Sequence, residues 1–153
     1  MWNFNKSVTL SLIACFLVGL VLVFLLFLAP YLLVEYFMGF RNMSLGIATG
    51  LTTVICYCFY PSAIFAFGAI YSLIKLLFNL KKGDIFIRKN SNYLRIISWC
   101  CIAVFFITLA GGFFYYPLFF VSVAAGFVGL ILRVVKNVMH SAVIIREEND
   151  LVV

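Results

Sequence analysis

The feature that most constrains this chain is the stretch from Ile96 to Leu132, which contains no charged residue. A single helix of this length would measure roughly 55 Å, whereas the hydrocarbon core of a bilayer is about 30 Å thick. Basic residues flank the stretch on both sides, and basic residues collect on the cytoplasmic side of a membrane, so an even number of crossings is required. Gly111, Gly112 and Pro117 are poor residues for a helix interior. The stretch therefore predicts a hairpin of two membrane-spanning helices that turns near these three residues.

The composition agrees with a membrane protein. Hydrophobic residues make up 66% of the chain and charged residues 10%, compared with roughly 45–50% and 25% in soluble domains. The formal net charge of +6 is what basic cytoplasmic loops produce, and it adds some attraction to anionic lipids. We therefore expect contact with the lipid bilayer and no direct binding of nucleic acid.

Two further apolar runs, Val8 to Leu33 and Asn42 to Ile74, are each long enough to cross a bilayer. The first is too long for a signal peptide, so we expect an uncleaved span that ends near Pro30. The second exceeds one upright span, and either Pro61 kinks the helix or the helix tilts and continues to Asn79, with Gly83 as a left-handed cap; both can hold. We predict one four-helix transmembrane domain over residues 1–153, with spans at about 8–33, 43–77, 94–113 and 117–140.

The basic residues predict the orientation. Ten of the eleven fall into three clusters that the apolar runs separate, and Arg41 alone lies elsewhere. The clusters consist of Lys6; of Lys75, Lys81, Lys82, Arg88, Lys89 and Arg95; and of Arg133, Lys136 and Arg146. We therefore expect a four-helix bundle in the bacterial cytoplasmic membrane, a multi-pass cell-membrane protein with both termini cytoplasmic.

No chemistry-bearing site emerges from the sequence. The cysteines lie inside the predicted spans without metal-ligand spacing, His140 is the single histidine, and no ionisable residue lies near the middle of a span. We expect no enzymatic activity, no metal and no cofactor. Small residues at helical spacing, Gly46 and Gly50 in one span and Ser122, Ala125, Gly126 and Gly129 in another, predict close helix packing. Whether that packing lies within the chain or in a homo-oligomer stays open.

Four of the five acidic residues lie in the loop from Asn79 to Arg95 and in the tail that follows the last span. We expect the tail to leave the helix after Ile145, and Asn90 or Ser91 to cap the helix that begins in the loop. Acids at a helix C-terminus oppose its dipole, so we hypothesise a clasp in which Glu147 and Glu148 pair with loop cations. The segments 85–87 and 151–153 are β-prone and would pair as short strands. A disordered tail is the alternative.

The same loop and tail carry a resemblance. The run Gly83-Asp84-Ile85-Phe86, followed by Asn90 and Leu94-Arg95-Ile96-Ile97, and the tail Glu147-Glu148-Asn149-Asp150-Leu151-Val152 resemble a bacterial family of small four-span membrane proteins of unknown function. Its members are often encoded beside a small Cro/C1-type helix-turn-helix protein, and the resemblance implies a regulatory pair. It implies no catalytic or ligand residues. The expected interaction surface comprises Gly83, Phe86, Arg88, Asn90, Arg95, Glu147, Glu148, Asn149, Asp150 and Leu151.

The leading functional hypothesis is a non-enzymatic membrane protein that regulates a small DNA-binding partner. Two alternatives stay open. One is an immunity protein that protects against a membrane-active peptide, and the other is a small channel or transporter subunit. The uncharged middle of the spans speaks against the transporter.

Overall fold

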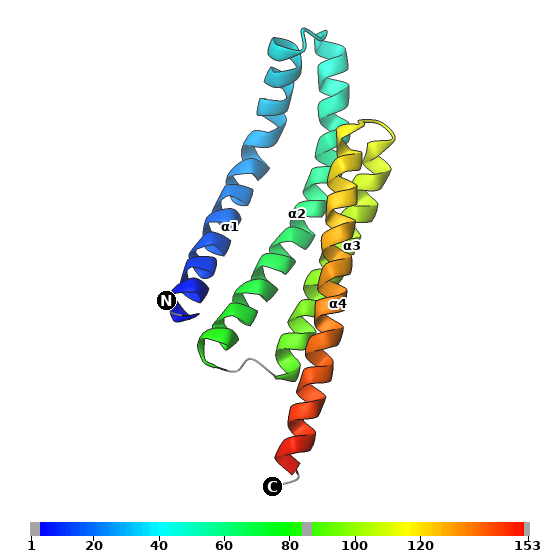
Figure 1. Cartoon of the computed structure of the whole chain (residues 1–153). Coiled ribbons are helices and arrows are strands. Elements are labelled where there is room, and N and C mark those ends of the chain that lie inside the picture. The colour runs from blue at the N-terminus through cyan, green and yellow to red at the C-terminus, as the bar shows by residue number, and fades with distance from the viewer. Residues whose placement is uncertain (1–3, 84–86, 152–153) are drawn as a thin grey trace.

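The computed structural model describes residues 4–83 and 87–151 as an all-helical chain (Figure 1). Its elements are α1 (Phe4–Glu35), a short π-helix η1 (Tyr36–Phe40), α2 (Leu45–Lys81), α3 (Arg88–Gly112) and α4 (Pro117–Leu151). The described residues include no strand. Four helices are long and apolar enough to cross a membrane. The predicted all-helical class and the number of four such helices are confirmed, and the chain is an integral membrane protein.

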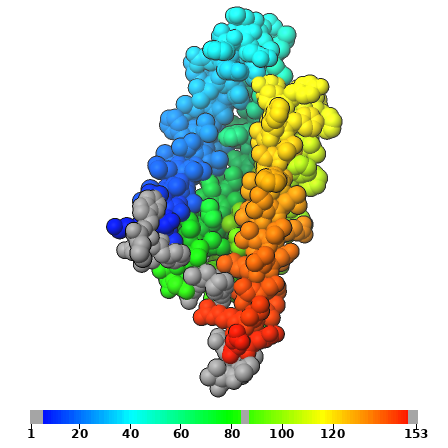
Figure 2. All heavy atoms as spheres, viewed as in Figure 1, coloured from blue at the N-terminus to red at the C-terminus, as the bar shows by residue number. Residues whose placement is uncertain are grey.

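The four helices of the bundle pack in an open row. Helix α2 contacts α1 and α3, and α3 contacts α4, but within the described residues no Cα atom of α1 lies within 8 Å of α3 or α4. Figure 2 shows α2 exposed between α1 and α4. Helix α1 exposes many of its own large apolar side chains, and Val8 is its single buried residue among those described. Most of α1 therefore faces outward, toward lipid.

Helix α1 continues through Pro30 to Glu35, five residues beyond the proline near which we expected the span to end. A proline lacks the N–H that would bond to the carbonyl four residues earlier, which here is that of Leu26. The Tyr60 hydroxyl of α2 donates a hydrogen bond to this carbonyl over 3.3 Å. Neighbouring helices commonly satisfy backbone groups that proline frees inside a membrane. Tyr60 thus lets α1 pass through Pro30 without an unpaired carbonyl in lipid.

This contact gives a first prediction. Tyr60→Phe removes the donor and should lower the free energy of unfolding by about 1 kcal/mol. In a Pro30→Ala background the backbone N–H restored at position 30 bonds to the Leu26 carbonyl, and the same substitution should then cost close to nothing. Unfolding of the four variants in detergent, titrated with dodecyl sulfate, measures the coupling. Equal costs in the two backgrounds would show that the hydroxyl does not substitute for the missing N–H.

Helix α2 runs without interruption past Pro61 and ends at Lys81. Gly83 follows with φ of +86°, a left-handed conformation that suits glycine. The Lys82 N–H donates to the Phe78 carbonyl over 3.2 Å, and the Gly83 N–H donates to the Leu80 carbonyl over 3.1 Å. The prediction of a continuing helix with a glycine cap is therefore confirmed.

Helices α3 and α4 pack closely through small residues. Ser98 Oγ donates to the Gly129 carbonyl over 2.8 Å, and Ser122 Oγ donates to the Phe105 carbonyl over 3.3 Å. A Cβ atom added to Gly126 would lie 2.9 Å from the Phe105 ring. The small residues of the last span therefore serve packing within the chain. Gly46 and Gly50 do not, because a Cβ atom added to either would have no neighbour within 4 Å.

Candidate functional site

The start of α1, the end of α2, the start of α3 and the end of α4 lie at one end of the molecule (Figure 1). We call this the basic end, because the three clusters of Lys and Arg lie in the parts of these helices nearest to it, from Arg133 at the middle of α4 onward, and on the connection between α2 and α3. Arg41 lies at the opposite end, between η1 and α2. The last turns of α4 project beyond the other helices (Figures 1 and 2).

We expected the tail to leave the helix after Ile145. Instead it continues as α4 to Leu151. Arg and Glu are good helix formers, so the run from Arg146 to Glu148 favours this continuation. Leu151 is helical, which rules out the strand that we expected to begin there. Ile87 of the other predicted strand is the N-cap residue of α3 and not part of a strand. Residues 85–86 and 152–153 lie outside the described residues.

One ion pair joins the start of α3 to the end of α4. Arg88 Nη2 lies 2.6 Å from Glu147 Oε2, and Arg88 Nε donates to Glu147 Oε1 over 3.0 Å, a two-point contact between guanidinium and carboxylate. Both side chains are well exposed, 71% for Arg88 and 46% for Glu147. The hydrogen bond from Arg88 is the largest effect on the pKa of the Glu147 carboxyl and lowers it. Partial desolvation opposes this effect, and the charges of Arg88 and His140 lower the pKa further. Glu147 also brings a negative charge to the N-terminus of α3, where Arg88 and Lys89 oppose the helix dipole.

The pair predicts different outcomes for two adjacent acids. Glu147→Lys places like charges together, so the last turns of α4 should fray and exchange their amide hydrogens faster. Glu148→Lys changes the net charge equally but removes no ion pair found among the described residues. Hydrogen exchange of residues 143–149, measured by mass spectrometry, compares the two. Equal acceleration in both variants would show that Arg88 does not hold the tail.

The pH dependence of this contact follows from the lowered pKa of Glu147. A carboxyl whose pKa is lower in the folded than in the unfolded state stabilises the fold above its unfolded pKa, and loses that effect as the pH falls through its folded pKa. Protection of the tail should therefore exceed that of Glu147→Gln at pH 7. The two should converge only well below pH 4.5, the ordinary value for this carboxyl. Convergence already at pH 6 would contradict the assignment.

The prediction that Asn90 or Ser91 caps α3 is wrong. The N-cap position is Ile87, with φ of −122° and ψ of 147° and no side-chain cap. Asn90 is fully buried, and its Oδ1 accepts a hydrogen bond from Asn79 Nδ2 over 2.8 Å. This bond connects the last turns of α2 to the first turn of α3. Asn90 is therefore an internal tether of the connection and not part of an exposed surface.

The remaining predicted surface residues fall into separate groups. Gly83, Glu148 and Asn149 are exposed. Arg95 does not join the tail acids but lines a different hollow, described below. Phe86 and the side chains of Asp150 and Leu151 lie outside the described part of the structure.

The structure also contains a feature that we did not predict, on the seam between α3 and α4. Three cationic side chains, Arg95, Arg133 and Lys136, line a hollow of about 60 Å³ together with Ser98 and Trp99. The Arg133 guanidinium lies 5.4 Å from the centre of the Trp99 ring. The helical spacing of Arg95 with Trp99, and of Arg133 with Lys136, places each pair on one helix face and is the sequence signal that would have indicated the hollow.

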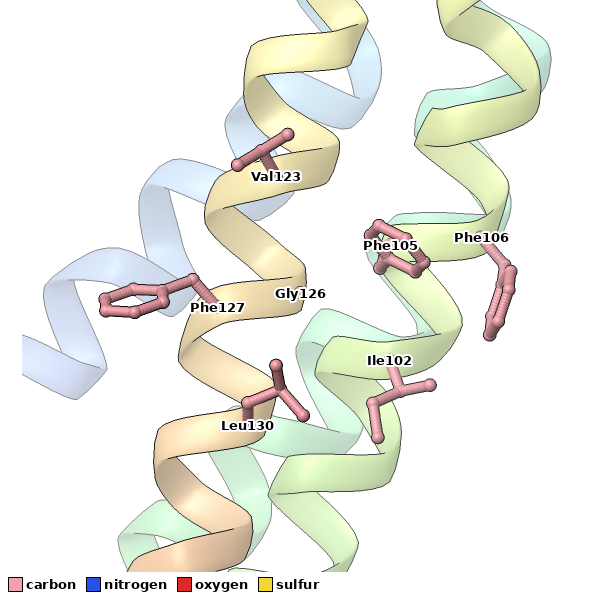
Figure 3. A pocket seen from close by; sticks show the side chains of 7 residues that line it. All are labelled: Ile102, Phe105, Phe106, Val123, Gly126, Phe127 and Leu130. Atoms are coloured by element: carbon pink, nitrogen blue, oxygen red, sulfur yellow. The ribbon is translucent and has the colours of Figure 1, made fainter.

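An apolar groove of about 450 Å³ lies farther along the same two helices (Figure 3). Phe105 and Leu130 point between the helices, and Phe127 and Phe106 stand at its two sides. Within residues 4–83 and 87–151 no cluster of three or more His, Cys, Asp or Glu side chains could hold a metal ion.

Comparison with known proteins identifies a family but no activity. A family profile described as "Protein of unknown function (DUF2975)" matches residues 6–153, so the chain belongs to this family. No curated protein and no solved structure matches the chain.

Proposed function

We propose that this member of the DUF2975 family is a non-enzymatic, multi-pass protein of the bacterial cytoplasmic membrane that binds a small helix-turn-helix DNA-binding protein. The binding surface in this proposal is the projecting end of α4 together with the start of α3. The basic end faces the cytoplasm, as the distribution of Lys and Arg favours.

The observation that carries the proposal is the length of α4. Its 35 residues correspond to about 52 Å, whereas the hydrocarbon core measures about 30 Å. Because the basic residues from Arg133 onward belong at or beyond the interface, the excess of roughly 20 Å extends from the basic end. A helical segment outside the bilayer is thus available to a soluble protein.

This segment carries apolar side chains that neither lipid nor the described residues cover. Val143 is buried, but Ile144 is 40% exposed and Ile145 is 58% exposed, next to the charged run that begins at Arg146. Exposed apolar residues on one helix, bordered by charges, are typical of a helix that docks into a groove of a partner. The Arg88–Glu147 pair holds the segment in position and so lowers the entropy cost of binding.

The identity of the partner rests on the resemblance to proteins often encoded beside a helix-turn-helix protein. In this function the membrane protein keeps the regulator at the membrane and away from its operator DNA. Release of the regulator would then require only that the end of α4 changes its contacts. No covalent chemistry is needed.

Co-purification tests the proposal. The tagged chain, extracted in mild detergent, should retain the helix-turn-helix protein encoded beside it. Ile145→Ser and deletion of residues 147–153 should each reduce retention at least about tenfold, as loss of a central contact would. Ile47→Ser is the matched control. Ile47 is also 58% exposed, but it lies at the start of α2, at the end of the molecule opposite the basic end. Failure of the unmodified chain to retain the regulator, or equal retention by Ile145→Ser and Ile47→Ser, would overturn the proposal.

A further inference from the structure

We propose that the seam between α3 and α4 is a binding site for one anionic phospholipid. Its headgroup phosphate binds the hollow formed by Arg95, Arg133 and Lys136, and one acyl chain lies in the adjoining apolar groove. This site is separate from the end of α4 and does not depend on the proposed function.

The hollow combines three positive charges that have no negative partner among the residues that the structure describes. In the part of the chain that the structure describes, none of the three cations has a carboxylate within 4.0 Å, since the one ion pair joins Arg88 to Glu147. Three cations that share one hollow repel each other, and an anion between them relieves the repulsion. Arginine and lysine donors suit phosphate oxygens, and basic pockets between membrane helices bind lipid headgroups.

The groove continues from the hollow toward the middle of the membrane. On α3, Arg95, Trp99 and Ile102 follow one another at helical spacing along one face. On α4, Arg133 is three residues from Leu130, which lines the groove. The distance along α4 from Arg133 to Val123, the farthest lining residue on this helix, is about 15 Å, or half of a hydrocarbon core of about 30 Å.

The dimensions and chemistry therefore match one leaflet lipid. The charged hollow lies where the uncharged run ends at Leu132, which is the position of an interface, and the groove reaches to the bilayer centre. Apolar side chains line the groove, together with Gly126, against which the Phe105 ring packs. A free phosphate ion would use only the hollow, whereas a phospholipid uses both parts.

Trp99 lines the hollow and provides the readout. With Trp2→Phe as the background, Trp99 is the single tryptophan of the chain. In vesicles, brominated phosphatidylglycerol should quench Trp99 at a mole fraction about tenfold lower than brominated phosphatidylcholine, because the three cations favour an anionic headgroup. The triple variant Arg95→Gln, Arg133→Gln, Lys136→Gln should lose this preference.

The control triple is Lys81→Gln, Lys82→Gln, Lys89→Gln, which removes the same charge from the same end and should keep the preference. The double variant Arg95→Lys, Arg133→Lys should also keep it, which guards against misfolding of the glutamine variant. Equal quenching by the two lipids in the unmodified background, or equal loss in both triples, would overturn the site.

Two further arms test the acyl chain. Val123→Phe fills the groove and should raise the mole fraction for half-maximal quenching about threefold, whereas Val128→Phe, on another face of α4, should not. Inorganic phosphate at 10 mM should leave the quenching by phosphatidylglycerol unchanged. Displacement by phosphate, or equal effects of the two phenylalanine variants, would show that the hollow binds an anion without the lipid chain. Partner retention is measured separately, so failure of either proposal leaves the other intact.

Discussion

Gly129→Leu is expected to lower the free energy of unfolding by about 3 kcal/mol, at the upper end of what overpacking a core costs. A Cβ atom at this position would lie 3.2 Å from Ile102 Cγ1, 3.3 Å from Cys101 Cβ and 3.5 Å from the Ser98 carbonyl oxygen. The larger leucine side chain has no open space on this face, so α3 and α4 must separate. Separation would also break the hydrogen bond from Ser98 Oγ to the Gly129 carbonyl.

Gly50→Leu is the matched control, because a Cβ atom at Gly50 has no neighbour within 4 Å. It makes the same change in a membrane helix and should leave stability within about 0.5 kcal/mol of the parent. Unfolding with dodecyl sulfate in mixed micelles compares the two variants. Equal destabilisation would show that the seam is not as tight as described, or that Gly50 packs against a second copy of the chain.

The number of helices was predictable because membrane helices obey length and charge constraints that a sequence displays directly. The uncharged stretch from Ile96 to Leu132 exceeds one span, and its helix-breaking residues mark the turn, which the structure has between Gly112 and Pro117. The side-by-side order of the helices was less accessible. Hydrophobicity does not drive helix association inside lipid, so apolar composition alone does not indicate which faces meet.

The path of α1 through Pro30 also depends on a contact between helices that the sequence does not indicate. The first span was expected to end near Pro30, and a proline inside a helix removes one backbone hydrogen bond. The Tyr60 hydroxyl, from a helix some thirty residues later, supplies the missing donor. A tertiary partner of this kind leaves no local signal, so the sequence could not indicate it.

The candidate site was likewise predictable only in part. Pairing between tail acids and loop cations was predictable from charge alone, and the structure contains it as Arg88 with Glu147. The choice among the cations was not, because it depends on how α4 continues as a helix beyond Ile145. The charge pattern contains Arg95, Arg133 and Lys136, but only the packing of α3 on α4 brings them to one hollow.

Asn90→Ala is expected to destabilise the chain by about 2 kcal/mol, in line with removal of a buried polar partner. Asn90 is fully buried, and its loss leaves the Asn79 side-chain amide without the acceptor that it now bonds over 2.8 Å. The connection between α2 and α3 should loosen as a consequence, and hydrogen exchange at the start of α3 should accelerate. Replacement of a residue on a binding surface would have a different effect: it would alter binding and leave the stability of the chain unchanged.

Asn92→Ala separates these cases, because Asn92 has the same side chain on the same helix but is exposed. It should change stability by less than about 0.5 kcal/mol. Asn79→Ala should cost less than Asn90→Ala, since Asn79 is only half-buried, and the double variant should cost less than the sum because the two residues share one bond. Additive costs would mean that the bond between Asn79 and Asn90 does not hold the two helices together.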